Sequence, residues 1–150
     1  MGMSDTRPGA GKRADTTAVL AWVRLARVFQ KMNRAAAAEF AAHGLSAAQF
    51  DVIAQLGRSA GITQQELANR LLVTKGNVSQ LLGKMEQRGL IARCHAGRAN
   101  ALSLTTEGQR LFAAVVPAHE ARIAARFSAL EPDERSQLLR LLRALDRSLE

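Results

Sequence analysis

The sequence predicts a mainly helical fold with one small two-stranded β-hairpin. Apolar residues recur at helical spacing through most of the 150-residue chain. Two short helical segments lie close together between residues 62 and 90. Leu90 to His95 then has strand-like character and Ala99 to Leu104 alternates apolar with polar residues, on either side of a turn at Ala96-Gly97. Two helices across a tight turn, followed by a hairpin, are the arrangement of a winged helix-turn-helix, whose second helix enters the DNA major groove.

A long first helix is expected from about Asp15 to Ala42. The preceding segment 1–14 is rich in Gly, Ser, Pro, Arg and Lys without an apolar period, and is predicted to be a flexible tail. Apolar residues occupy most of the helix circumference, which is more than one side of a small domain buries, so a second subunit is the economical source of cover. Basic residues form one stripe along the helix, at Arg24, Arg27, Lys31 and Arg34.

A second helix is expected at about 47–59. Gly44 can end the first helix, and Ser46 can cap the second with Gln49 in the capping-box position. The residues predicted to face inward are Phe50, Ile53, Ala54 and Gly57.

The helix-turn-helix itself opens at Thr63, where Glu66 three residues later completes a capping box. Its first helix carries a narrow apolar face of Leu67, Ala68 and Leu71. Thr74 is the N-cap candidate of the second helix, and Gly89 is expected to end it. The i, i+3, i+4, i+7 spacing predicts burial of Val78, Leu81, Leu82 and Met85.

The outer face of that second helix is rich in hydrogen-bonding side chains and carries no carboxylate; Glu86 lies nearer the flank. Asn and Gln pair with adenine edges, Lys reaches guanine or phosphate, and Gly allows close approach of a backbone. A solvated helix face usually mixes acids with bases, so the pattern favours DNA contact. The face consists of Lys75, Asn77, Ser79, Gln80, Gly83, Lys84, Gln87 and Arg88, and Gly76 beside it also allows close approach.

The hairpin would form the wing, with Leu102 and Leu104 on one side and Arg98 near the tip. A narrow minor groove attracts arginine through its negative potential, so Arg98 is a candidate minor-groove contact. Thr105 is then expected to cap a helix whose apolar face is Leu111, Phe112, Val115 and Val116.

Pro117 lacks a backbone donor and should kink this helix, and the apolar pattern resumes beyond it at Ile123 and Phe127. Pro132, flanked by acids, marks the start of the last helix. The leucines of that helix are typical of an oligomer seam: Leu138, Leu139, Leu141, Leu142, Leu145 and Leu149.

The charge balance favours a polyanionic partner, because the formal net charge is +8, from 21 basic and 13 acidic residues. Residues 46–104 contribute seven bases, Arg58, Arg70, Lys75, Lys84, Arg88, Arg93 and Arg98, against three acids. One cysteine excludes an internal disulfide framework and fits a reducing compartment. The sequence contains neither a bilayer-spanning stretch nor a signal-peptide core, so the expectation is a cytoplasmic protein without a membrane partner.

The order of these pieces resembles the MarR family of multiple-antibiotic-resistance regulators. The residues that carry the resemblance are Thr-Gln-Gln-Glu-Leu-Ala, Val-Thr-Lys-Gly-Asn-Val-Ser-Gln-Leu-Leu, Arg-Gly-Leu-Ile and Leu-Ser-Leu-Thr-Thr-Glu-Gly, in this order. The resemblance implies a homodimer that represses transcription from pseudo-palindromic promoter sites on double-stranded DNA. It also implies release from DNA by a small, often aromatic and anionic, effector that binds between the dimer and DNA-reading parts.

The resemblance places Thr74, Lys75, Asn77, Ser79, Gln80 and Lys84 in the major groove and Arg98 on the wing arginine. The family's wing usually carries an Asp-Arg-Arg run, and the matching stretch here is Ala96-Gly97-Arg98. The acid that orients the arginine is absent, and so is one base.

The expected organisation has four parts: the tail 1–14, an N-terminal dimerisation helix at 15–45, the winged helix-turn-helix at 46–104, and C-terminal dimerisation helices at 105–150. Trp22 with Arg24 and Arg27 is a candidate site for the aromatic anion, against the alternative that Trp22 is buried in the dimer seam.

Other chemistry is less well supported. No nucleophile elbow or phosphate loop is present, which argues against an enzyme, and no cofactor is expected. His43, His95 and His119 are scattered without metal-ligand spacing, so no metal site is expected. Cys94 is interpreted as a small core residue of the wing strand rather than a redox sensor. A winged helix used for protein contact or RNA binding stays open as the alternative function.

Overall fold

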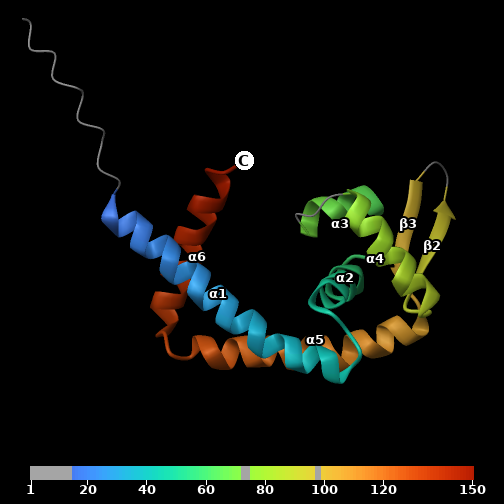
Figure 1. Ribbon diagram of the computed structural model, residues 1–150, viewed down its shortest axis with the longest axis horizontal. Coiled ribbons are helices and arrows are strands. Elements are labelled where there is room, and N and C mark those ends of the chain that lie inside the picture. The colour runs from blue at the N-terminus through green and yellow to red at the C-terminus, as the bar shows by residue number, and fades with distance from the viewer. Residues whose placement is uncertain (1–14, 72–74, 97–98) are drawn as a thin grey trace, which may run out of the picture.

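A computed structural model describes residues 15–71, 75–96 and 99–150; the side chains of Lys75, His95, Ala96, Ala99 and Asn100 also lie outside the description. The expected tail at 1–14 falls outside it. The elements are α1 (Thr16–Ala42), α2 (Ala47–Arg58), β1 (Ile62–Thr63), α3 (Gln64–Leu71), α4 (Lys75–Gln87), β2 (Ile91–Ala96), β3 (Ala99–Leu104), α5 (Thr106–Phe127) and α6 (Pro132–Arg147). Figure 1 shows a compact lobe of α2, α3, α4 and the sheet, and an elongated arm formed by α1, α6 and most of α5.

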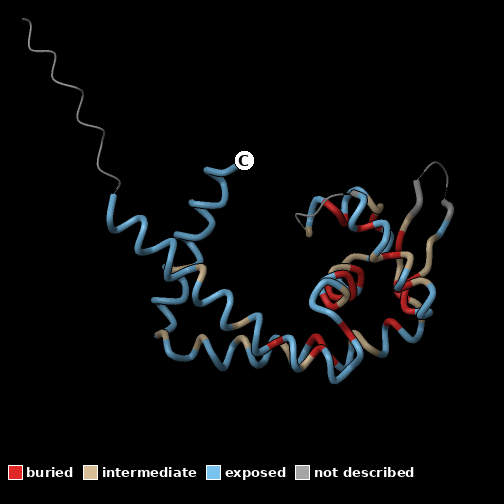
Figure 2. Tube along the Cα trace, viewed as in Figure 1, coloured by how far each residue is buried: buried red, intermediate tan, exposed pale blue. Residues whose placement is uncertain are grey.

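The buried residues lie mainly in the lobe and at its junction with the arm (Figure 2). Three of the four residues predicted to anchor the second helix of the motif, Val78, Leu82 and Met85, have no exposed surface, and Leu81 is partly buried against the same core. Full burial of such a side chain stabilises the fold by about 1.5–3 kcal/mol. The remaining fully buried large residues come from α2, α3 and β3: Val52, Ile53, Leu56, Leu67 and Leu102.

Helix boundaries follow the predicted caps. Ser46 and Gln49 form a reciprocal capping box at the start of α2, with distances of 3.1 and 3.0 Å. Thr63 and Glu66 do the same before α3, at 3.1 and 2.7 Å. Gly89 after α4 has φ 70°, the left-handed conformation that glycine adopts without steric cost.

The sheet has three strands in the order β1-β3-β2, so the prediction of a two-stranded hairpin was incomplete. β2 and β3 pair antiparallel from Ile91↔Leu104 to Ala96↔Ala99, as expected of a wing. The added strand β1 pairs Ile62 with Leu102 and Thr63 with Ala101. Two residues are too few to show alternation, which is why β1 was overlooked.

α5 connects the lobe to the arm. It runs from Thr106 to Phe127 with Pro117 inside it, so Pro117 does not end the helix, and the kink there stays a prediction. Thr105 caps it, because Thr105 Oγ1 accepts a hydrogen bond from Gly108 N at 3.1 Å. The Phe112 ring of α5 packs onto Gly57 of α2, since a Cβ at Gly57 would stand 2.1 Å from that ring.

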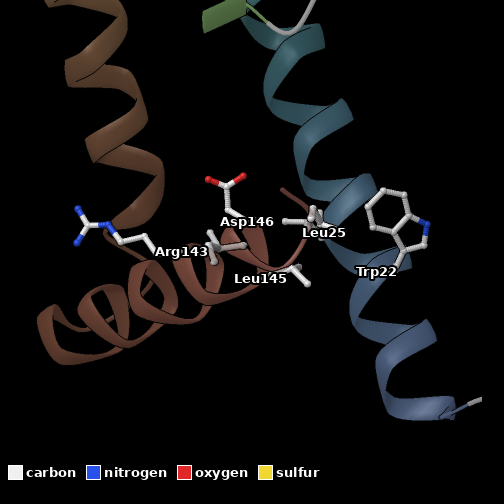
Figure 3. A pocket seen from close by; sticks show the side chains of 7 residues that line it. Trp22, Leu25, Arg143, Leu145 and Asp146 are labelled. Carbon is white, nitrogen blue, oxygen red and sulfur yellow. The ribbon is translucent and has the colours of Figure 1, made fainter. Parts of the chain in front are cut away.

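The arm exposes a large apolar surface. Trp22 and Phe29 of α1 are 66% and 63% exposed, and α6 has no buried residue at all. Leu25 and Trp22 of α1 lie beside Leu145 and Asp146 of α6, around a cavity of about 360 Å³ (Figure 3). A second cavity of about 620 Å³ between the same helices has a mainly apolar lining that includes Trp22 and Arg24 but not Arg27.

Candidate nucleic-acid interface

α4 presents one polar face to solvent because its opposite face is locked in the core. Val78, Leu82 and Met85 point inward with no exposed surface. At 100° per residue, the side chains predicted to read DNA must therefore project outward. All of those that the structure describes, Asn77, Ser79, Gln80 and Lys84, are exposed. Gly76 and Gly83 lie on the same side with open space around them.

Three predicted contact residues cannot be compared with the structure. Thr74 and Arg98 lie outside the described residues, and Lys75 is described only as the first residue of α4. Their assignment to the major groove and to the wing stays a prediction.

α3 packs against the buried side of α4. Leu67 and Ala68 are buried in the shared core, whereas Gln65, Glu66 and Asn69 remain outside. The pKa of Glu66 is lowered, mainly because its carboxylate accepts the Thr63 backbone N–H. The capped turn therefore keeps an ionised carboxylate where the positive end of the α3 dipole lies.

Arg88, which was predicted to lie on the outer polar face of α4, is exposed but hydrogen-bonded to another part of the chain. Its Nη1 donates to the Gly44 carbonyl oxygen at 2.8 Å and to Gln49 Oε1 at 3.2 Å. Arg88 therefore fastens the end of α4 to the turn between α1 and α2. The sequence offered no signal for this, because the partners lie 44 and 39 residues away.

Glu86 and Arg93 form a second link that sequence reasoning missed. Arg93 Nε donates to Glu86 Oε1 at 2.5 Å, and its Nη1 donates to Gln64 Oε1 at 2.8 Å. One guanidinium thus joins β2, α4 and α3.

Cys94 is exposed, so its interpretation as a core residue was wrong. Side chains alternate along β2. Ile91 and Arg93 share the face that pairs with Leu104 and Leu102, and Cys94 points to the opposite, solvent side.

His119 lies at the junction between arm and lobe. Its ring meets those of Phe40 and Phe50 edge-on, at centroid distances of 5.0 and 4.8 Å. Its Nδ1 is 3.7 Å from Glu39 Oε2, which in turn lies 2.7 Å from Arg122 Nη1. Among the described residues, no three His, Cys, Asp or Glu side chains are grouped to hold a metal ion.

A cavity of about 360 Å³ opens beside this junction, between α2, α3 and α5. Arg58 of α2 pairs with Glu120 of α5 at its edge, and Arg70 of α3 also lines it. Burial raises the pKa of the Asp51 carboxyl in the same lining, against the lowering influence of His119.

No helix in the described part of the chain is long and apolar enough to cross a membrane.

Comparisons with known proteins agree with this architecture. The profile of the MarR family matches residues 43–99. The chain is 30% identical over 127 residues to an HTH-type transcriptional regulator of Bacillus cereus, covering 85% of this chain and 86% of that protein. It is 30% identical over 129 residues to the HTH-type transcriptional repressor MdtR of Bacillus subtilis, covering 84% and 83%.

Among solved structures, that of the S. aureus MepR–DNA complex is similar with a TM-score of 0.78 at 24% identity, covering 85% of this chain and 96% of that one. This likeness supports the winged-helix fold. With the family profile and the sequence relatives, it leads to one conclusion: the chain belongs to the MarR family of DNA-binding HTH-type transcriptional regulators, and not to a class of enzymes.

Proposed function

We propose that this protein is a homodimeric repressor that binds pseudo-palindromic promoter DNA through α4 of each subunit. The outer face of α4 carries the proposal: Asn77, Ser79, Gln80 and Lys84 are exposed together, with no carboxylate among them. The buried side of α4 fixes this orientation. Two such helices, about 34–36 Å apart, enter successive major grooves of one duplex.

The apolar surface of the arm supports the homodimer. Leu142 and Leu145 of α6 are 36% and 50% exposed, and Trp22, Val23 and Val28 of α1 exceed 50%. A monomer that exposes a contiguous apolar surface of this kind is prone to associate. A second copy brings the same surface, and a two-fold axis lets each arm cover the other.

Repression is the mode of regulation that we propose, and it rests on similarity. The relative MdtR is named a transcriptional repressor. A dimer bound across a promoter blocks access to it, which requires no activity beyond tight DNA binding.

A small aromatic anion is the effector that fits the cavity between α2, α3 and α5. Its volume of about 360 Å³ falls in the range of small-ligand sites. Phe50 offers an aromatic wall, and a carboxylate that binds Arg58 would displace Glu120 from it. Because Arg58 and Glu120 join α2 to α5, this exchange would alter the contact between lobe and arm. The cavity beside Trp22 and Arg24 is the second candidate, although a partner subunit would cover it.

The test is selection of duplexes from a random-sequence library with the full-length protein. Binding to the selected duplex and to a scrambled one is then compared for Asn77→Ala and Gln80→Ala. Each variant should lose about 1–3 kcal/mol of discrimination at the base that it reads. Gln137→Ala, an exposed glutamine on the arm, is the matched control and should behave as wild type.

An unchanged ratio of selected to scrambled binding in both variants would exclude α4 as the reading helix. Preference for an RNA duplex of the same sequence would favour the alternative of an RNA-binding winged helix.

A further inference from the structure

Arg93 is placed to join the wing to both helices of the helix-turn-helix. It projects from β2 and contacts Glu86 on the last turns of α4 and Gln64 at the start of α3. The Arg93 and Glu86 side chains are 24% and 36% exposed, so water screens this pair less than an ordinary surface pair. The exposed pair Arg110–Glu107, at 3.0 Å with 73% and 56% exposure, shows the contrast within the same chain.

Both contacts depend on the planar shape of the Arg93 guanidinium. Nε donates to Glu86 and Nη1 to Gln64, so the planar fork is held along two directions at once. Such charge-assisted bonds are short and directional. Lysine has a single point charge and cannot reproduce both contacts.

From this we infer that Arg93 is a positioning residue that makes the wing and the recognition helix α4 act as one rigid body on DNA. The inference rests on the proposed function, because Arg93 has no DNA contact of its own and acts only through the DNA contacts of α4 and the wing. Arg93 is the third residue of β2, near the end of the hairpin that follows α4. Holding Arg93 against Glu86 therefore fixes the orientation of β2 and β3 relative to α4.

The alternative role for an arginine at this place is a direct phosphate contact. A substitution at Glu86 distinguishes the positioning role from the phosphate contact. If Arg93 bound phosphate, then Glu86→Gln would remove a negative charge near DNA, free the guanidinium, and strengthen binding to every sequence. If Arg93 acts through Glu86, the same substitution weakens specific binding. The two roles therefore predict opposite signs for one variant.

The experiment compares wild type, Arg93→Gln, Glu86→Gln and the double variant on the selected duplex and its scrambled control. Hydroxyl-radical footprinting reports the minor groove, and guanine N7 methylation protection reports the major groove. Both single variants should lose about tenfold in specific affinity and should lose minor-groove protection outside the α4 contacts. Major-groove protection should persist, and the double variant should be no weaker than either single one.

Controls separate positioning from stability. Arg110→Gln breaks the exposed pair in α5 and should leave affinity and footprints unchanged. Arg93→Lys keeps the charge, and it should unfold at the wild-type urea midpoint within about 0.5 M while still losing minor-groove protection. If Arg93→Gln or Glu86→Gln proves unfolded by circular dichroism, Arg93→Lys decides the question by its footprint alone.

The inference fails if Glu86→Gln binds as tightly as wild type or more tightly, or if Arg93→Lys keeps the full minor-groove footprint. Failure of the proposed function looks different: the wild-type protein itself would then not distinguish the selected duplex from the scrambled one.

Discussion

The contact between the start of α5 and Leu90, in the link between α4 and β2, yields a sharp stability prediction. Gly108 is buried in the first turn of α5, and a Cβ built there would lie 2.0 Å from the Leu90 carbonyl oxygen and 3.2 Å from Leu104 Cβ. The carbonyl is backbone and already accepts the Thr105 N–H at 3.1 Å, so it cannot turn away cheaply. Gly108→Ala must therefore push α5 away from the lobe.

The expected cost follows from these contacts. Overpacking costs about 1–3 kcal/mol, and weakening the Leu90–Thr105 hydrogen bond adds about 1 kcal/mol. Alanine recovers at most about 1 kcal/mol through its better helix propensity. Gly108→Ala should thus lower the free energy of unfolding by roughly 1–3 kcal/mol, and 2 kcal/mol corresponds to about 4–8 °C in Tm for a chain of this size.

Gly83→Ala is the matched control. Gly83 lies within α4, where an added Cβ meets nothing within 4 Å. The same substitution should raise stability there by about 0.5–1 kcal/mol. Urea denaturation followed by circular dichroism, at one fixed protein concentration because a dimer is expected, measures both. A Gly108→Ala protein as stable as wild type would refute the steric reasoning, and so would equal losses in both variants.

Three further substitutions test the arm, the junction and the interface. Leu142→Asp should bury a carboxylate in the dimer seam at a cost of about 3–5 kcal/mol, so sedimentation velocity should show a dissociated or unfolded protein. Arg140→Asp, on the opposite face of α6, should leave the dimer intact. A folded, dimeric Leu142→Asp protein would contradict the proposed seam. Burial raises the folded-state pKa of Asp51, so the protonated carboxyl stabilises the folded state. This stabilisation is fully present below the unfolded-state pKa and is lost as pH rises through the folded-state pKa. Asp51→Asn should therefore be slightly more stable than wild type at pH 7, the change being small because Asp51 keeps contact with solvent; equal urea midpoints at pH 7 and pH 4 in both proteins would refute this. Lys84→Ala should weaken binding to all duplexes alike and reduce the salt slope by about 0.9 per subunit; a loss confined to the selected duplex would instead make Lys84 a base contact.

Features with a local signal were predicted from the sequence. The capping boxes at Ser46 and Thr63 and the i, i+3, i+4, i+7 set on α4 depend on residues within two turns of one another, and the structure confirms them. Features that depend on distant partners were missed. β1 exists because two residues pair with β3 some forty positions later, and Cys94 is exposed because the sheet packs through its other face.

The candidate DNA surface shows the same limit. The sequence identified the polar face of α4, because burial of its apolar positions leaves the others outside. It could not separate Arg88 from that face, since the turn that captures Arg88 belongs to the corner between α1 and α2. The sequence shows how many basic side chains a segment contains, but only tertiary contacts show which of them are available to bind DNA.

That distinction leads to a quantitative expectation for DNA binding. Residues 46–104 contain seven basic side chains, but the structure engages three of them internally: Arg58 with Glu120, Arg88 with Gly44, and Arg93 with Glu86. The other four, 7 − 3 = 4, are Arg70, Lys75, Lys84 and Arg98, and the side chains of Lys75 and Arg98 lie outside the described residues. If all four reach phosphate, a dimer makes eight such contacts. At about 0.9 counterions released per phosphate contact, the slope of log K against log salt should not be steeper than about −7. A steeper measured slope would mean that basic residues outside this segment reach the duplex, or that DNA pulls one of these arginines from its internal partner.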